Sequence, residues 1–181
     1  MDKNIVSSII PKLYKCDPKY LFIYNQNIFF HDLSLLFESA EKIYFTDVCV
    51  KNDDGSIVSV EKIVEIAVKA KSFTFRGGSI TSKTMKELLK IPNFLKLDEF
   101  YMYHISEDFD LETFYNYMKK NKTTKFWFYF ENQISEAYKN RIETIIDEII
   151  TTKKFDYKPP VLAFNGDDHE KFEILRNIYF S

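Results

Sequence analysis

Short runs of aromatic and β-branched residues alternate along the chain with stretches whose apolar residues recur every three or four positions. The runs favour β-strands, and the longer period is typical of amphipathic helices. Strands are predicted at Tyr20–Tyr24, Lys42–Val50, Ser72–Phe75, Phe100–Ile105, Lys125–Phe130 and Val161–Phe164. Helices are predicted at His31–Phe37, Val58–Ala70, Ser82–Ile91, Asp110–Lys120, Ile134–Ile150 and Asp168–Ile178. This alternation predicts an α/β fold.

The strand–helix unit recurs at nearly constant spacing. Ile43 and Phe73 are 30 residues apart, Phe73 and Phe100 are 27 apart, and Phe100 and Trp127 are 27 apart. This period is close to that of leucine-rich-repeat solenoids. We therefore expect repeated strand–helix units that form a leucine-rich-repeat-like curved stack, with a parallel sheet and helices on its other face. No segment follows the leucine-rich consensus, so a doubly wound sheet with helices on both faces is the competing arrangement.

The junctions between strands and helices show capping chemistry. A hydroxyl follows an apolar residue in Ile80-Thr81-Ser82, Ile105-Ser106-Glu107 and Ile134-Ser135-Glu136. Such hydroxyls accept hydrogen bonds from the first free N–H groups of a helix. Asp167 and Glu170 have capping-box spacing before the last predicted helix.

Residues 1–181 are expected to form a single interaction domain, because no linker or low-complexity tract divides them. Residues 1–40 would form an N-terminal cap and residues 152–181 a C-terminal cap. The Pro159-Pro160 pair ends the longest helical stretch and leads into the last predicted strand.

Composition and charge narrow the class of protein. Of the 181 residues, 45% are apolar and 17% aromatic, which excludes an intrinsically disordered chain. The formal net charge of −2 lacks the basic surplus of a nucleic-acid binder, which argues against nucleic acid as the partner. No apolar run approaches the ~20 residues of a membrane span, and the N-terminus has no secretory pattern. A soluble cytoplasmic or nuclear protein with free thiols at Cys16 and Cys49 is the expectation.

No motif in the sequence carries recognisable catalytic chemistry. His31, His104 and His169 lack metal-ligand spacing, and Gly77-Gly78 is not part of a Walker or dinucleotide-binding pattern. We therefore expect a non-enzymatic protein without a cofactor or metal. An enzyme would need a polar pocket at the strand ends near His104 and Asp108.

The aromatic run at residues 126–130 indicates a binding surface. Alternate residues of a strand face opposite ways, so Trp127 and Tyr129 oppose Phe126, Phe128 and Phe130. Tyr101 and Tyr103 on the preceding strand would extend the Trp127 face. Tyr and Trp are enriched at interaction hot spots, so Tyr101, Tyr103, Trp127 and Tyr129 are the candidate binding residues. The competing interpretation is that both faces are core.

Three segments resemble a known family. They read ITSKTMKELLKIPNFLKLDEF (80–100), FDLETFYNYMKKNKTTKFWFYF (109–130), and ISEAYKNRIETIIDEI (134–149) with FDYKPP (155–160). They are similar to the FTH-type regions that follow the F-box in many nematode F-box proteins. Membership would imply a substrate-recruiting, non-catalytic module of a Skp1–cullin–F-box-type ubiquitin ligase, with a protein partner. Residues 1–37 show no convincing F-box opening, and IIPKL (9–13) is the nearest approach.

A second hypothesis is an RNA- or nucleotide-binding accessory domain. It would use Lys119, Lys120 and Lys122 together with nearby aromatic residues. A protein-interaction module remains the leading hypothesis.

Overall fold

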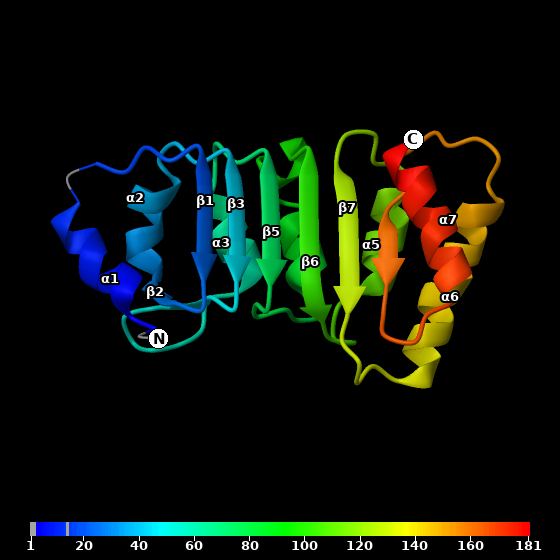
Figure 1. The fold of residues 1–181 in the computed structure, drawn as a ribbon, viewed down its shortest axis with the longest axis horizontal. Helices are drawn as coiled ribbons and strands as arrows, with labels where there is room; N and C mark the ends of the chain where they lie inside the picture. Colours follow the sequence, from blue (N-terminus) through cyan, green and yellow to red (C-terminus); the bar gives the residue numbers. More distant parts are fainter. Residues whose placement is uncertain (1–2, 14) are drawn as a thin grey trace.

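The structure of the chain is a computed structural model that describes residues 3–13 and 15–181. Its main feature is a six-stranded sheet in which every neighbouring pair is parallel (Figure 1). The strands are β1 (Tyr20–Tyr24), β3 (Lys42–Thr46), β5 (Ser72–Arg76), β6 (Glu99–Ile105), β7 (Lys125–Phe130) and β8 (Val161–Ala163). They lie side by side in chain order. The α/β class and the parallel sheet predicted from the sequence are therefore confirmed.

A second parallel pair joins β2 (Asn27–Phe29) to β4 (Cys49–Lys51). The helices are α1 (Ile5–Ile9), α2 (Leu33–Phe37), α3 (Val60–Ile66), α4 (Thr84–Leu88), α5 (Leu111–Met118), α6 (Glu136–Thr151) and α7 (His169–Phe180). Short 3-10 turns occur at Ile10–Lys12, Phe30–Asp32 and Phe94–Lys96. The sequence analysis missed α1 and β2, which are too short to show a clear period.

One face of the sheet is packed against the helices that follow the strands. Phenylalanine rings from this face are fully buried and contact aromatic rings of the helical layer. Phe37 of α2 lies 5.7 Å from Phe45, and Phe114 of α5 lies 4.6 Å from Phe128, measured between ring centroids. Tyr138 of α6 similarly contacts Phe130 at 5.7 Å. Burial of these aromatic rings stabilises the packing of the helices on the sheet.

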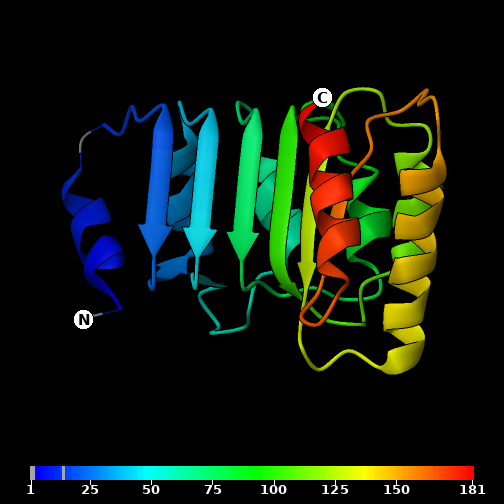
Figure 2. The same cartoon turned by 45° about the vertical axis from the view of Figure 1, so that its right-hand side comes forward.

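Helix α7 lies on the opposite face of the sheet. Figures 1 and 2 both show α7 in front of the strands at the C-terminal end of the sheet, roughly along them and in the reverse direction. Its Tyr179 ring contacts the Trp127 ring at 5.5 Å. The expected arrangement placed helices on one face, and α7 departs from it because Trp127 offers an apolar patch that the amphipathic last helix buries.

Four neighbouring strands have a left-handed residue at the same register position. Tyr24, Thr46, Arg76 and Tyr103 are aligned across these strands. The residue that follows each of them has a positive φ: Asn25 (50°), Asp47 (53°), Gly77 (73°) and His104 (59°). Asn, Asp, His and Gly are the residues that tolerate this left-handed conformation best. The left-handed residue follows the end of β1, β3 and β5, whereas in β6 it lies inside the strand, where the register with β7 shifts.

Several element boundaries predicted from sequence need correction. The run Lys42–Val50 is two strands, because the left-handed Asp47 turns the chain between β3 and β4. The 27-residue spacing counted from Phe100 leads to Trp127, whereas the strand register places Phe100 opposite Phe126. A spacing count alone cannot detect this one-residue shift.

The capping predictions were correct for one helix. The Ser135 side chain accepts a hydrogen bond from the Tyr138 N–H at the start of α6. Helix α5 is capped by Asp110 rather than Ser106, and α7 by Asp168 rather than Asp167. A carboxylate next to the first turn also gains from the helix dipole, which a hydroxyl does not.

Candidate binding face

The outward face of the sheet carries side chains in three rows that cross the strands. The middle row contains Phe22, Tyr44, Thr74, Tyr101 and Trp127, which the strand register places next to one another. Tyr20, Lys42, Ser72, Glu99 and Lys125 form the row at the strand starts, and Tyr24, Thr46, Arg76, Tyr103 and Tyr129 form the row at the strand ends. The alternation of each strand thus builds one continuous surface.

The part of this surface on β1, β3 and β5 is uncovered. We call it the open half, and it consists of Tyr20, Phe22, Tyr24, Lys42, Tyr44, Thr46, Thr74 and Arg76. Tyr20, Phe22 and Tyr24 are 61%, 68% and 62% exposed. The rings of Phe22 and Tyr44 stack with centroids 4.4 Å apart and planes 9° apart. Exposed aromatic rings held flat on a rigid sheet are unusual unless they meet a partner.

The four residues predicted to bind lie on this same face, in two different environments. Trp127 is covered by α7, where its ring contacts Phe172 at 6.2 Å and Tyr179 at 5.5 Å. The Tyr179 hydroxyl donates a hydrogen bond to the Tyr101 hydroxyl over 3.0 Å. Burial raises the pKa of both phenols, that of Tyr179 to about 12, so both remain neutral.

Tyr101 and Trp127 are therefore not the free surface that the sequence analysis expected. They form the site on which α7 packs, which we call the α7 seat. Replacing Trp127 with Ala would disturb this packing and would not isolate a contact with a partner. Tyr103 and Tyr129 are half-buried beside the seat. Their role in binding stays a prediction.

The sequence analysis did not select Tyr20, Phe22, Tyr24 and Tyr44. A signal was present, because the aromatic residues of YLFIY (20–24) alternate with the aliphatic Leu21 and Ile23. In a strand with one buried face, this pattern assigns the aromatic residues to the outer face. The same alternation places Tyr44 between the buried Ile43 and Phe45.

The open half is flanked by basic side chains. A hollow of about 290 Å³ at the strand starts is lined by Lys19, Tyr20, Glu41, Lys42 and Lys71. The Lys19 and Lys71 ammonium groups hydrogen-bond Glu41 and lower the pKa of its carboxyl to about 2. Lys42 lies over the Tyr20 ring, 5.7 Å from its centroid. Three ammonium groups and one carboxylate thus line the hollow, and its net charge is positive.

The hollow beside His104, where an enzyme would require a polar pocket, contains only one of the two expected residues. His104 lines a hollow of about 300 Å³ with Tyr129, Glu131, Asn132 and Gln133, and Asp108 does not line it. His104 is exposed and has a left-handed backbone inside β6, at the point where the register with β7 shifts. Residues 3–13 and 15–181 contain no group of three His, Cys, Asp or Glu side chains that could hold a metal ion.

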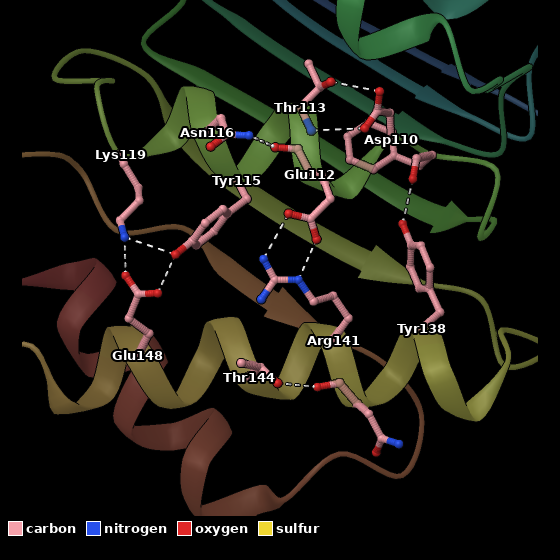
Figure 3. Close-up of polar contacts among 12 residues, drawn as sticks. Asp110, Glu112, Thr113, Tyr115, Asn116, Lys119, Tyr138, Arg141, Thr144 and Glu148 are labelled. Carbon is pink, nitrogen blue, oxygen red and sulfur yellow. Dashed lines mark hydrogen bonds and ion pairs between the residues drawn. The ribbon is translucent and has the colours of Figure 1, made fainter.

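The lysine cluster behind the nucleic-acid hypothesis lies on the helical side, where one of its members is engaged. Figure 3 shows Lys119 reaching from α5 to Glu148 of α6, with which it forms an ion pair. The Tyr115 hydroxyl donates to the same carboxylate over 2.5 Å, and Arg141 of α6 bonds Glu112 of α5. These contacts join two helices, so Lys119 stabilises the fold. Lys120 and Lys122 remain exposed.

Another hollow lies on the helical side. It has a volume of about 710 Å³ and lies between α3 and the segment that follows α4. Two ion pairs line it, Lys62 with Glu65 and Lys90 with Glu87. Its charges are thus largely neutralised within the chain, and we regard the open half as the better candidate site.

Comparison of the chain with protein-family models, with curated proteins and with solved structures finds no match in any of the three. Among the residues that the structure describes, no helix combines the length and the apolar character needed to cross a lipid bilayer. The functional argument therefore rests on the residues of the open half.

Proposed function

We propose that the chain is a non-catalytic protein–protein interaction module that binds its partner through the open half. The observation that carries this proposal is the row of aromatic side chains on β1, each more than half exposed, beside the stacked Phe22–Tyr44 pair. Large apolar side chains on a rigid sheet lose little conformational entropy when a partner covers them.

We also propose that the fold is a short, leucine-rich-repeat-like stack. The left-handed residue that recurs at the same register position of β1, β3, β5 and β6 supports this, as does the chain-order arrangement of the strands. In such a stack, each unit contributes one strand to a shared binding surface.

Site-specific photocrosslinking tests the binding face. Phe22 is replaced by p-benzoyl-phenylalanine, and the protein is irradiated in nematode lysate, the source that the family resemblance implies. Val68 on the helical side, 69% exposed, carries the same probe as a matched control. Adducts specific to position 22 that disappear with Tyr44→Ser support the proposal. Equal adducts from both positions, or none from position 22, contradict it.

The family resemblance adds a more specific proposal, that the module recruits substrates to a Skp1–cullin–F-box-type ubiquitin ligase. Purified Skp1 tests this directly. Binding of Skp1 to the immobilised chain with micromolar or tighter affinity would support a role in the ligase. Absence of binding would remove direct Skp1 recruitment and leave the interaction module in place.

A further inference from the structure

Helix α7 shows what kind of element the outward face accepts. It lies along the strands of the covered half, in contact with Tyr101 of β6 and Trp127 of β7. The face thus already holds one amphipathic helix, packed through aromatic side chains. The open half continues the same three rows of side chains onto β5, β3 and β1.

The dimensions of the open half match one further helix. Three neighbouring strands span about 10 Å between the outer two axes, and a helix has a diameter of about 10 Å. A helix centred over β3 would cover Tyr44 and reach Phe22 and Thr74 on the two neighbouring strands. It would be separate from α7, because three strand spacings, about 14 Å, lie between β3 and β7.

The charges of the open half specify an acidic partner. Its outward strand residues include Lys42 at the strand starts and Arg76 at the strand ends, and none of those that the structure describes is acidic. Lys42 and Arg76 are separated by four residues along the strand direction, or about 13 Å. Between them lie Phe22, Tyr44 and Thr74. The surface is therefore basic at both ends and largely aromatic in the middle.

In a partner helix that fits Lys42 and Arg76, the two acidic residues have a defined spacing along the sequence. Two carboxylates seven residues apart lie about 10.5 Å apart along the axis and on the same side. The long side chains of Lys42 and Arg76 cover the remaining few ångströms. The third and fourth positions after the first carboxylate would place apolar side chains on Phe22 and Tyr44.

We infer that the open half binds an amphipathic helix of a partner protein that lies along β3, with acidic residues at i and i+7 and apolar residues at i+3 and i+4. This inference rests on the proposed function and names the class of its partner. Lys42 and Arg76 select the carboxylates, and Phe22 and Tyr44 hold the apolar side chains.

A displayed library of helix-forming peptides randomised at i, i+3, i+4 and i+7 provides the test. It is selected on the immobilised full chain and counter-selected on the Phe22→Ser/Tyr44→Ser variant. Affinities of enriched peptides are then measured by fluorescence anisotropy. Far-UV circular dichroism and Trp127 emission verify that each variant is folded.

The expected result is enrichment of Asp or Glu at i and i+7 with Leu, Ile or Phe between them. Lys42→Glu or Arg76→Glu should weaken binding about tenfold or more, and a peptide with Lys in place of the matching acid should recover binding to that variant. Val68→Ser, on the helical side, should have no effect.

Other outcomes separate the two proposals. Peptides that depend on Phe22 and Tyr44 but carry no acids overturn the acidic helix and leave the binding face in place. Peptides insensitive to Phe22 and Tyr44, or no enrichment, contradict both. A single-stranded oligouridine probe that binds in a salt-sensitive, Phe22-dependent way would replace the protein partner with nucleic acid. Self-association abolished by the Phe22→Ser/Tyr44→Ser variant would identify a second copy as the occupant.

Discussion

The seat of α7 gives the most quantitative prediction, because Tyr179 joins this helix to the sheet through several contacts. Its side chain is 5% exposed, its ring contacts Trp127, and its hydroxyl bonds Tyr101. The Lys125 ammonium group also lies 5.1 Å from its ring centroid. Replacing Tyr179 with Ala removes all of these side-chain contacts at once.

Truncation of a buried aromatic residue to Ala typically costs about 3–5 kcal/mol, which combines lost transfer free energy with the cavity left behind. Among its described residues, α7 buries only Tyr179 and Leu175 fully. An isolated helix of this length is marginal in water. We therefore expect Tyr179→Ala to detach α7 while the rest of the sheet stays folded.

The assay uses tryptophan fluorescence, because Trp127 is the single tryptophan of the chain and lies beneath α7. In Tyr179→Ala, the emission should shift to the red and acrylamide quenching should increase in the absence of denaturant. Tyr179→Phe should keep the native emission and lose only about 1 kcal/mol, the value of one hydrogen bond. Phe180→Ala, on the exposed flank, should change stability by about 0.5 kcal/mol.

Native Trp127 emission in Tyr179→Ala, with a free energy of unfolding within about 0.5 kcal/mol of the wild type, would refute this account of the α7 seat. Global unfolding instead of local detachment would show that α7 is part of one cooperative unit with the sheet.

Three further predictions follow from individual contacts. Phe128 is fully buried on the helical face, so Phe128→Ala should lower the free energy of unfolding in urea by about 3–5 kcal/mol. Phe22→Ala on the open half should change it by no more than about 0.5 kcal/mol. Equal losses for the two variants would refute the assignment of faces. Asn121→Ala should lower the free energy of unfolding by about 2 kcal/mol, because the buried Asn121 amide donates to the Thr124 carbonyl and accepts from the Thr124 N–H. Thermal unfolding of the variant measures this loss, and an unchanged stability would contradict the prediction. The pKa of Glu41 is lowered from 4.5 to about 2, so its contribution to stability is present above about pH 5 and is lost as the pH falls toward 2. Glu41→Gln should therefore reduce the decrease in the free energy of unfolding between pH 5 and pH 2. An unchanged decrease would show that Lys19 and Lys71 do not stabilise the Glu41 charge.

Which segments form strands could be predicted from local patterns. The run Lys125–Phe130 is β7 with the same bounds, and Tyr20–Tyr24 is β1. In both strands, buried residues alternate with less buried ones, and this alternation is a property of neighbouring residues in the chain. Helix boundaries were less well predicted, because α3 and α4 end earlier than their apolar periods suggest.

The binding face was predicted only in part. The sequence correctly placed Tyr101, Tyr103, Trp127 and Tyr129 on one side of the sheet, since residue parity decides this. It could not show that Trp127 lies beneath α7, because Phe172 and Tyr179 are distant in sequence from the strands they cover. A helical period shows that α7 has an apolar side and does not specify which surface buries it.

The sequence by itself determined the alternation of strands and helices and the division of each strand into two faces, whereas the left-handed turn at Asp47 became apparent only in the structure. The first two features depend on local backbone sterics and on side-chain period. The tertiary structure decided which strands are neighbours, that Phe100 pairs with Phe126, and that α7 covers half of the outward face. Those outcomes depend on competition between distant apolar surfaces for burial, so the position of the open half became apparent only when the sheet was assembled.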